Sequence, residues 1–381
     1  MKRYLCVSTL SILLALPLVA AGPARVWVLN NNGEGKQIQI IDPDTNKIVR
    51  TVEGIRYPHG IAFSPDGKLA YVVSEDEQAT NALWEIDTKT GKILRSAPLS
   101  AHRGNVPAIT ADGKQLFICV QPPRKADNEA CGSASSQCGG PNAGPAHGAL
   151  DLVDTGTLKV LKTLPFSGHD CYTTPDGKYF VAGAGSLPGG GLLVIDAKTF
   201  QEAWRVPIRE GMGPIAFLTN PDGSTKTVLV TPLNQRVRQI AVIDFATHKE
   251  VTRITLPKEP GKFEVAPPLT RRTPLPVHGF AISPDGKTLA IGVRDANAVF
   301  FYSLPDLKLQ GHFSTPVNAA AKHPADGGDP GWLTYLPDGK KLYVASAAAD
   351  VVSVVDTKTL KEVVRIPVGK QPDHVWTQVM P

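Results

Sequence analysis

The feature of this sequence that most limits its fold is a turn motif that occurs six times in 381 residues. The copies are SPDGK at Ser64, TADGK at Thr110, TPDGK at Thr174, NPDGS at Asn220, SPDGK at Ser283 and LPDGK at Leu336. Aspartate supplies a side-chain acceptor and glycine accepts a positive φ, while proline, absent only from the second copy, presets φ. Recurrence at steps of 46 to 64 residues indicates a repeat architecture in which each motif joins two strands.

The sequence around each turn is typical of four antiparallel strands. A short apolar stretch such as residues 61–63 precedes the turn, and a β-rich stretch such as residues 69–73 follows it. A third stretch then ends in an acid, and a fourth stretch with alternating polarity comes next. The third stretches are residues 82–87, 149–154, 192–196, 240–244 and 351–356. Four strands per repeat predict the blade of a β-propeller.

A seventh unit is divided between the two ends of the sequence. Residues 25–52 supply three strands without a preceding turn motif, and residues 371–380 supply a lone strand. Pairing of these segments in one sheet would remove the exposed edges that otherwise promote aggregation. The predicted fold class is therefore all-β, a seven-bladed β-propeller of four-stranded antiparallel blades whose ring is closed by the N-terminal strands and the C-terminal strand.

The N-terminal residues have the pattern of a secretory signal peptide. Lys2 and Arg3 precede an apolar run over residues 5–18, and small residues follow before Gly22. We expect cleavage after residue 21, and a single propeller over residues 22–381 with insertions at about 121–147 and 258–276. The apolar run is short for a transmembrane helix, so we predict no membrane span after cleavage and a periplasmic or secreted protein.

The charge distribution argues against nucleic acid as a partner. The full chain carries a net charge of +5, and loss of Lys2 and Arg3 lowers it by two charges to +3. Acids and bases alternate at short range, whereas a nucleic-acid binder concentrates its cations on one face. We expect a small ligand or another extracytoplasmic protein as the partner.

Four cysteines remain after the predicted cleavage, an even number in an oxidising compartment. Two disulfides are the simplest interpretation, and of the three possible pairings we favour Cys131 with Cys138 in one loop and Cys119 with Cys171 on neighbouring strands. Buried free thiols are the alternative.

The repeat resembles that of the YVTN-repeat β-propeller family. The resemblance is clearest in KLYVASAAADVVSVVDTKTLKEVVRIPVG, and it covers essentially all of the chain after the signal peptide. It implies the propeller fold but leaves the function open, since proteins of this architecture include binding proteins, copper enzymes, haem-binding propellers and lactone enzymes. Function must therefore come from a site.

One repeat position is enriched in histidine. Residues just before the innermost strands surround one mouth of the central channel of a propeller, and counting seven residues back from the turn aspartate identifies most of them. These positions are His59, Asn105, His169, His278 and Gly331, with Gly213 and Asp373 aligned by apolar pattern. Three of the nine histidines of the chain occupy this position, and we call the seven residues the mouth ring.

The mouth ring is a candidate metal site. Neutral imidazoles of His59, His169 and His278 suit zinc, copper or iron, and Asp170 or Asp373 would orient a ring or join the ligands. His102 and His374 are weaker candidates at the same mouth. The structural alternative is that these histidines only cap hydrogen bonds of the innermost strands.

Further residues beside the mouth ring are weaker candidates for ligand contact. They are Asn105, Asp170, Trp332 and Trp376. The two indoles would stack on a flat ligand, or they would pack between blades, as tryptophans near inner strands usually do.

The fold and the place of these histidines resemble those of two propeller groups, namely copper propellers such as nitrous oxide reductase and the haem-binding propeller of cytochrome-type nitrite reductase. We expect copper or zinc rather than haem, because the sequence has no Cys-x-x-Cys-His segment. A quinone cofactor, PQQ, is disfavoured because no adjacent cysteine pair occurs.

Three functions agree with these features. The first is a ligand- or protein-binding module, which needs no catalytic group. The second is a metal- or haem-dependent oxidoreductase, or its assembly factor, with His59, His169 and His278 as ligands. The third is a lactonase- or lyase-like enzyme that uses a divalent ion held by histidine and carboxylate. The sequence does not decide whether the protein is an enzyme.

Overall fold

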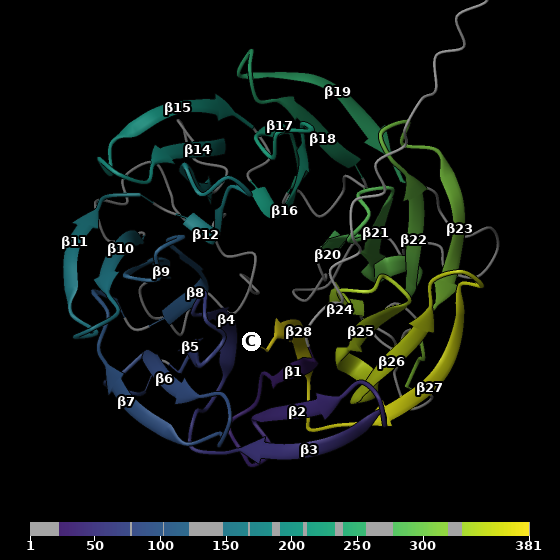
Figure 1. The fold of residues 1–381 in the computed structure, drawn as a ribbon, viewed down its shortest axis with the longest axis horizontal. Helices are drawn as coiled ribbons and strands as arrows, with labels where there is room; N and C mark the ends of the chain where they lie inside the picture. The colour runs from purple at the N-terminus through teal and green to yellow at the C-terminus, as the bar shows by residue number, and fades with distance from the viewer. Residues whose placement is uncertain are drawn as a thin grey trace, which may run out of the picture.

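The computed structural model contains seven four-stranded antiparallel sheets arranged around a common axis (Figure 1). It describes residues 23–76, 78–101, 103–121, 148–166, 168–184, 191–208, 212–232, 239–256, 277–318 and 330–380. The predicted all-β, seven-bladed propeller is therefore confirmed. Among the described residues we find no helix with the length and hydropathy needed to cross a bilayer.

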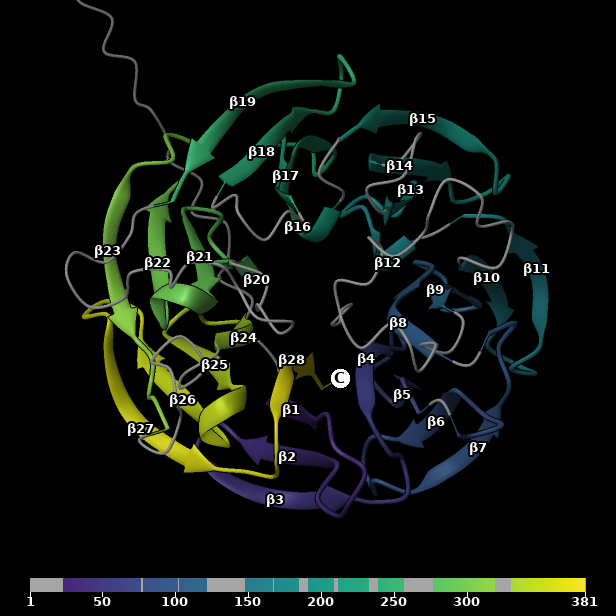
Figure 2. The same cartoon turned by 180° about the vertical axis from the view of Figure 1, so that it is seen from behind.

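Each blade runs from an innermost strand beside the axis to an outer strand at the rim (Figures 1 and 2). The innermost strands are β4 (Pro58–Phe63), β8 (Arg103–Ile109), β12 (Gly168–Thr173), β16 (Met212–Thr219), β20 (Val277–Ile282), β24 (Pro330–Tyr335) and β28 (Pro372–Val379). The second strands are β5 (Leu69–Ser74), β9 (Gln115–Gln121), β13 (Tyr179–Ala184), β17 (Thr225–Pro232), β21 (Thr288–Val293), β25 (Lys341–Ser346) and β1 (Ala24–Asn30).

The third strands are β6 (Leu83–Asp87), β10 (Ala149–Asp154), β14 (Gly191–Asp196), β18 (Gln239–Asp244), β22 (Ala298–Ser303), β26 (Val351–Asp356) and β2 (Ile38–Asp42). The outer strands are β7 (Ile93–Ala97), β11 (Val160–Leu164), β15 (Glu202–Pro207), β19 (Lys249–Thr255), β23 (Leu309–Ser314), β27 (Lys361–Pro367) and β3 (Lys47–Val52). Short 3₁₀ turns η4 (Arg294–Ala296) and η6 (Ala347–Ala349) follow two of the second strands.

The ring is closed as the sequence predicts, because the C-terminal strand joins the N-terminal sheet. β28 pairs antiparallel with β1, from Ala24 opposite Val379 to Asn30 opposite Pro372. In this sheet the order is β28-β1-β2-β3, so the last strand of the chain becomes an innermost strand. Closure therefore brings residues from the end of the sequence to the axis.

Buried apolar side chains pack between neighbouring sheets rather than within one. One cluster joins Trp27 and Ile40 of the closing blade to Ile61 and Val72 of the next blade. At another such boundary Cys119 on β9 and Cys171 on β12 lie at disulfide distance, with their Cα atoms 6.0 Å apart. The predicted pairing of these two cysteines is thus confirmed by their placement, and Cys131 and Cys138 lie outside the described residues.

Aspartates hold the turns that repeat along the sequence. In the first Pro-Asp-Gly turn the Ser64 hydroxyl donates to Asp66 Oδ1 at 2.7 Å, and the backbone N–H of Lys68 donates to the same oxygen at 3.2 Å. The acid that ends each third strand has a similar role, since Asp87 Oδ1 accepts from the backbone N–H of Thr90 at 2.7 Å. The residues that repeat along the sequence are therefore those that form the hydrogen bonds of the turns.

These turns predict that acid destabilises the fold. Hydrogen bonds from Ser64 and Lys68 lower the pKa of Asp66 from an ordinary 3.8 to about 2, and those from Thr90 lower the pKa of Asp87. A depressed folded-state pKa stabilises the protein above the unfolded-state pKa, and this stability is lost as pH falls through the folded-state value. We expect the thermal midpoint to fall steeply between about pH 4 and pH 2.

The matched test replaces the aspartates of the first three Pro-Asp-Gly-type turns with asparagine, at Asp66, Asp112 and Asp176. The variant should have a lower midpoint than the native protein at pH 7 and a shallower fall in acid, because fewer carboxylates are protonated on unfolding. Differential scanning calorimetry across this pH range measures both quantities. An acid slope equal to that of the native protein would contradict the assignment.

Candidate functional site

All seven mouth-ring residues lie at a break in strand register. In β4, Pro58 pairs with Ser74 and Gly60 pairs with Val73, so His59 has no residue opposite it. The same break occurs at the start of the other six innermost strands. An extra residue of this kind bends a strand and redirects its side chains. The bulges thus explain how one repeat position comes to present side chains at the axis.

Four buried histidines meet around the axis from blades that are distant in sequence. The ring centroids of His59 and His374 are 4.4 Å apart, those of His59 and His169 are 6.0 Å apart, and those of His278 and His374 are 5.9 Å apart. None of the four is more than 3% exposed. The structure therefore brings together the three predicted histidines and adds His374, which we now treat as a central member. We call these four residues the histidine cluster.

Two histidines of this cluster and the neighbouring Asp373 have the spacing of metal ligands. One donor atom each from His59, Asp373 and His374 lies within 4.8 Å of the other two. The Nδ1 atoms of His59 and His374 are 3.4 Å apart, and Asp373 Oδ2 is 3.7 Å from His374 Nδ1. Ligands at about 2.0–2.2 Å from one ion lie up to about 4.4 Å apart. Only small side-chain movements would place all three on one ion.

The electrostatic environment keeps most of the cluster neutral. Burial lowers the pKa of His59, and it places the pKa values of His278 and His374 well below the usual range. Nearby cations act in the same direction on the latter two, Arg294 on His278 and protonated His59 on His374. An imidazole must be neutral to bind a metal ion, so these three side chains are in the ligating form.

His169 differs from the other three histidines because it has a carboxylate partner. Its Nδ1 is 2.8 Å from Asp170 Oδ1, and the hydroxyl of Tyr172 donates to Asp170 Oδ2 at 3.4 Å. Burial lowers the pKa of His169, but the charge and hydrogen bond of Asp170 outweigh burial and raise it overall. Asp170 therefore orients a ring, which is one of the two roles that the sequence suggested for it.

Several buried polar atoms of the site have no hydrogen-bond partner among the described residues. They are His59 Nε2, His169 Nε2, His278 Nδ1, His374 Nε2 and both side-chain polar atoms of Asn105. Buried polar groups are nearly always satisfied by protein, water or a ligand. Histidines that only capped the innermost strands would be satisfied by backbone groups. Water or a bound ligand would satisfy these atoms.

Two ion pairs flank the cluster, and sequence reasoning missed three of their four members. In the first pair, which is buried, Arg103 Nη2 lies 2.6 Å from Glu75 Oε1, and that oxygen is 3.7 Å from His59 Nε2. In the second pair, which is partly buried, Arg294 Nη2 lies 2.9 Å from Asp373 Oδ1. Glu75 and Arg294 each follow directly after a second strand, β5 and β21. A charged residue at that repeat position was the available sequence signal.

The two candidate tryptophans pack together next to the cluster. The ring centroids of Trp332 and Trp376 are 4.8 Å apart, and Trp332 lies 5.0 Å from His374. Each indole nitrogen is buried and has no acceptor among the described residues. Beside them, a Cβ at Gly331 would lie 2.3 Å from the backbone oxygen of Asp373, which explains glycine at this position of the mouth ring.

Some predicted features cannot be placed. His102, Cys131 and Cys138 lie outside the described residues, as do residues 122–147 and 257–276, which contain nearly all of the two predicted insertions.

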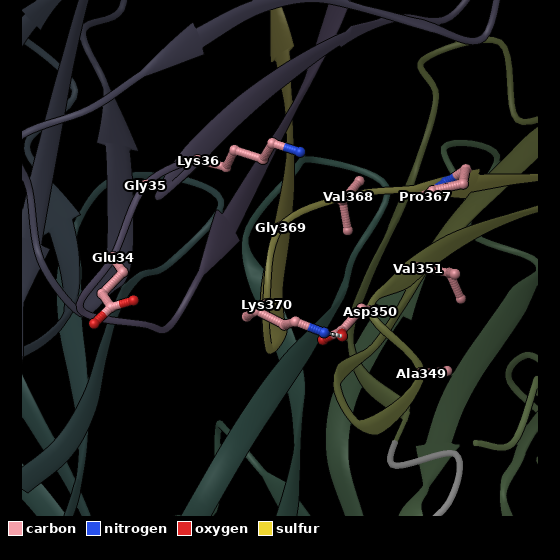
Figure 3. A pocket seen from close by; sticks show the side chains of 10 residues that line it. All are labelled: Glu34, Gly35, Lys36, Ala349, Asp350, Val351, Pro367, Val368, Gly369 and Lys370. Carbon is pink, nitrogen blue, oxygen red and sulfur yellow. Dashed lines mark hydrogen bonds and ion pairs between the residues drawn. The ribbon is translucent and has the colours of Figure 1, made fainter. Parts of the chain in front are cut away.

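A separate cavity of about 540 Å³ opens at the boundary between the β24–β27 blade and the closing blade (Figure 3). Its lining residues are Glu34, Gly35, Lys36, Ala349, Asp350, Val351, Pro367, Val368, Gly369 and Lys370. Lys370 and Asp350 form an ion pair on one side of it (Figure 3). None of the four clustered histidines is part of this lining, although the segment that ends at Lys370 leads into β28.

Comparison with known proteins shows the fold and leaves the family open. No protein-family model matches the sequence, and no curated protein matches it significantly. The YVTN-repeat resemblance is therefore unconfirmed at the level of family, although the fold that it implied is confirmed. Function must again be argued from the site.

Three solved structures with the same fold illustrate how different the proteins with this fold are. Dihydro-haem d1 dehydrogenase NirN, solved in complex with DHE, has a TM-score of 0.60 and 15% identity, over 92% of this chain and 74% of that one. Hydrazine synthase of Kuenenia stuttgartiensis has a TM-score of 0.63 and 18% identity, over 88% and 95%. A putative 6-phosphogluconolactonase of Bacteroides fragilis has a TM-score of 0.65 and 16% identity, over 95% and 99%. At these identities the likeness concerns the fold alone.

Proposed function

We propose that this protein is a metal-binding β-propeller and that a first-row transition-metal ion is held by His59, His374 and Asp373. The observation that carries the proposal is the meeting of two buried histidines and a carboxylate at ligand spacing. The lowered pKa values of His59 and His374 support it, because both rings are neutral. The imidazole of His169 lies beside that of His59, and the imidazole of His278 lies beside that of His374. These two side chains would either join the metal ligands or shield the ion from solvent.

The donor set favours copper or zinc over other ions. Imidazole nitrogen suits copper, zinc, iron and nickel, whereas magnesium and calcium prefer sites made of oxygen ligands. Two nitrogens with one carboxylate oxygen therefore argue against a lactonase or lyase that depends on magnesium or calcium. Bound copper would supply one-electron chemistry, and bound zinc would supply a Lewis acid.

Close packing favours an ion over haem. The side chains of the histidine cluster are nearly inaccessible to solvent, and their ring centroids lie 4.4 to 6.0 Å apart. A planar macrocycle would have to separate these rings, while an ion would only draw them together. The haem-related names among the structural neighbours add no weight to haem here, because the likeness is one of fold. The predicted signal peptide supports a place in the periplasm or outside the cell.

The first test is metal content. Protein purified from the periplasm without chelator should hold copper or zinc at close to one ion per chain, and His59→Gln with His374→Gln should hold less than about a tenth of that. His248→Asn is the matched control, since His248 is exposed and has a positive φ that asparagine accepts. Elemental analysis and circular dichroism of each variant measure metal and folding.

A native protein without metal would argue against the proposal if it also failed to retain Cu²⁺ or Zn²⁺ after dialysis. Equal metal content in the native protein and the folded double variant would do the same, because the ion would then lie elsewhere. Asp373→Asn should weaken retention less than the double variant, since an amide oxygen still ligates but carries no charge.

A second candidate, a small-ligand binding module, is supported by the cavity of Figure 3. Its volume of about 540 Å³ falls within the range of small-molecule sites. The cavity offers both signs of charge, with Glu34 and Lys36 on one side and the Lys370–Asp350 pair on the other (Figure 3). This arrangement suits a polar ligand that carries both donors and acceptors.

Thermal-shift screening with polar metabolites tests this second candidate. A ligand of this cavity should raise the melting temperature of the native protein, while Val351→Trp, which fills the cavity, should abolish the rise. The double variant of His59 and His374 should retain it. A rise that survives Val351→Trp would exclude this cavity as the site.

A further inference from the structure

The three proposed metal ligands come from the innermost strands of two neighbouring blades. His59 lies on β4, whereas Asp373 and His374 lie on β28 (Figures 1 and 2). These two strands belong to different sheets, so no ladder of strand hydrogen bonds sets the distance between them. Contacts between the sheets must therefore hold the ligands at the observed spacing.

Both strands are entered through an unusual backbone conformation. In each case a residue with a left-handed backbone, followed by a proline, comes directly before the first proposed ligand. The left-handed residues are Tyr57, with a φ of 50°, and Gln371, with a φ of 54°. A residue before proline normally adopts an extended conformation, and bulky residues rarely have a positive φ. Strained conformations of this kind persist only where surrounding contacts enforce them, and they concentrate at functional sites.

One loop contacts both of these segments. It joins β1 to β2, and the backbone N–H of its Asn31 donates to the carbonyl oxygen of Gln371 at 2.8 Å. The carbonyl oxygen of Asn32 accepts from the backbone N–H of Tyr57, also at 2.8 Å. In addition, Asn32 Nδ2 donates to the carbonyl oxygen of Lys370 at 2.9 Å. Two consecutive residues thus tie the segment before β4 to the segment before β28.

The side chain of Asn32 has two distinct roles in this tie. The residue is only 9% exposed, and its Oδ1 accepts from the backbone N–H of Glu34 at 2.8 Å, which closes a turn within the loop. Oδ1 therefore shapes the loop, while Nδ2 holds the segment before β28. A substitution that keeps an acceptor and removes the donor separates the two roles.

We infer that Asn32 is a positioning residue of the metal centre. It holds the segments before β4 and β28 so that His59, Asp373 and His374 lie at ligand spacing in the absence of the ion. The inference rests on the proposed metal site, and it assigns to that site a residue that acts through the segments before the ligands. Without the tie, both segments would relax from their strained conformations and the ligands would separate.

The experiment compares Cu²⁺ binding by the full-length mature protein and by Asn32→Ser. The serine hydroxyl still accepts from the N–H of Glu34, as hydroxyls do in such turns, but it is too short to reach the carbonyl of Lys370. We expect Asn32→Ser to bind Cu²⁺ about tenfold more weakly in a competition titration with a chelating dye, since residues that orient metal ligands contribute roughly this factor. Its copper EPR spectrum should also change, because the ligands would no longer have one fixed geometry.

Two further variants make the comparison specific. Asn32→Asp has the shape of asparagine and keeps the acceptor but loses the donor, so it should show the same loss of affinity. Asn220→Ser is the matched control. Asn220 Nδ2 donates to Ser224 Oγ at 2.9 Å in the turn after β16, at the end of the blade opposite the mouth ring. This variant also loses a side-chain hydrogen bond of a turn, but it should keep the native copper affinity and spectrum. Circular dichroism shows whether each variant is folded.

The outcomes distinguish this inference from the metal proposal. Native copper affinity and a native EPR spectrum in whichever Asn32 variant folds would overturn the positioning role and leave the metal site standing. An equal loss of affinity in Asn220→Ser would also overturn it, because the effect would then reflect stability alone. A native protein that does not retain Cu²⁺ would overturn both proposals.

Discussion

The pairing of β28 with β1 is the contact on which the rest of this structure depends. It closes the seven sheets into a ring, and it does so with the strand that carries Asp373 and His374. The same hydrogen bonds therefore complete the fold and complete the candidate metal site. In an open ring β1 would expose an unpaired edge, and the two ligands from the end of the chain would have no fixed position beside His59.

The bulge at the start of each innermost strand determines which side chains reach the axis. The extra residue is a histidine in β4, β12 and β20, whereas in β28 it is Asp373 and His374 follows it in register. Histidines from four blades thus meet although they are separated by up to 315 residues in sequence. Burial then makes three of them poor bases. Burying four polar imidazoles costs free energy, and a purely structural cluster would not need them, since apolar residues would pack there without that cost. The arrangement is readily understood if the neutral imidazoles bind a ligand.

Much of the fold follows from local chemistry that can be read in the sequence. The Pro-Asp-Gly turns and the strand-ending aspartates predict the blades, and predicted third strands such as residues 149–154 and 351–356 have the observed bounds. The mouth ring could be predicted because repeat spacing carries a position from blade to blade. Repeat spacing alone could not predict that His374, which follows Asp373, would lie closer to His59 than the other histidines of the cluster do.

The flanking ion pairs escaped prediction for a physical reason. Glu75 and Arg103 belong to different blades, and their contact depends on how two sheets pack, which no periodicity within one repeat encodes. Both members of such a pair are needed, because the charge of Glu75 or Arg103 alone in that buried position would strongly destabilise the fold. Charge compensation therefore links the blades around the axis in pairs.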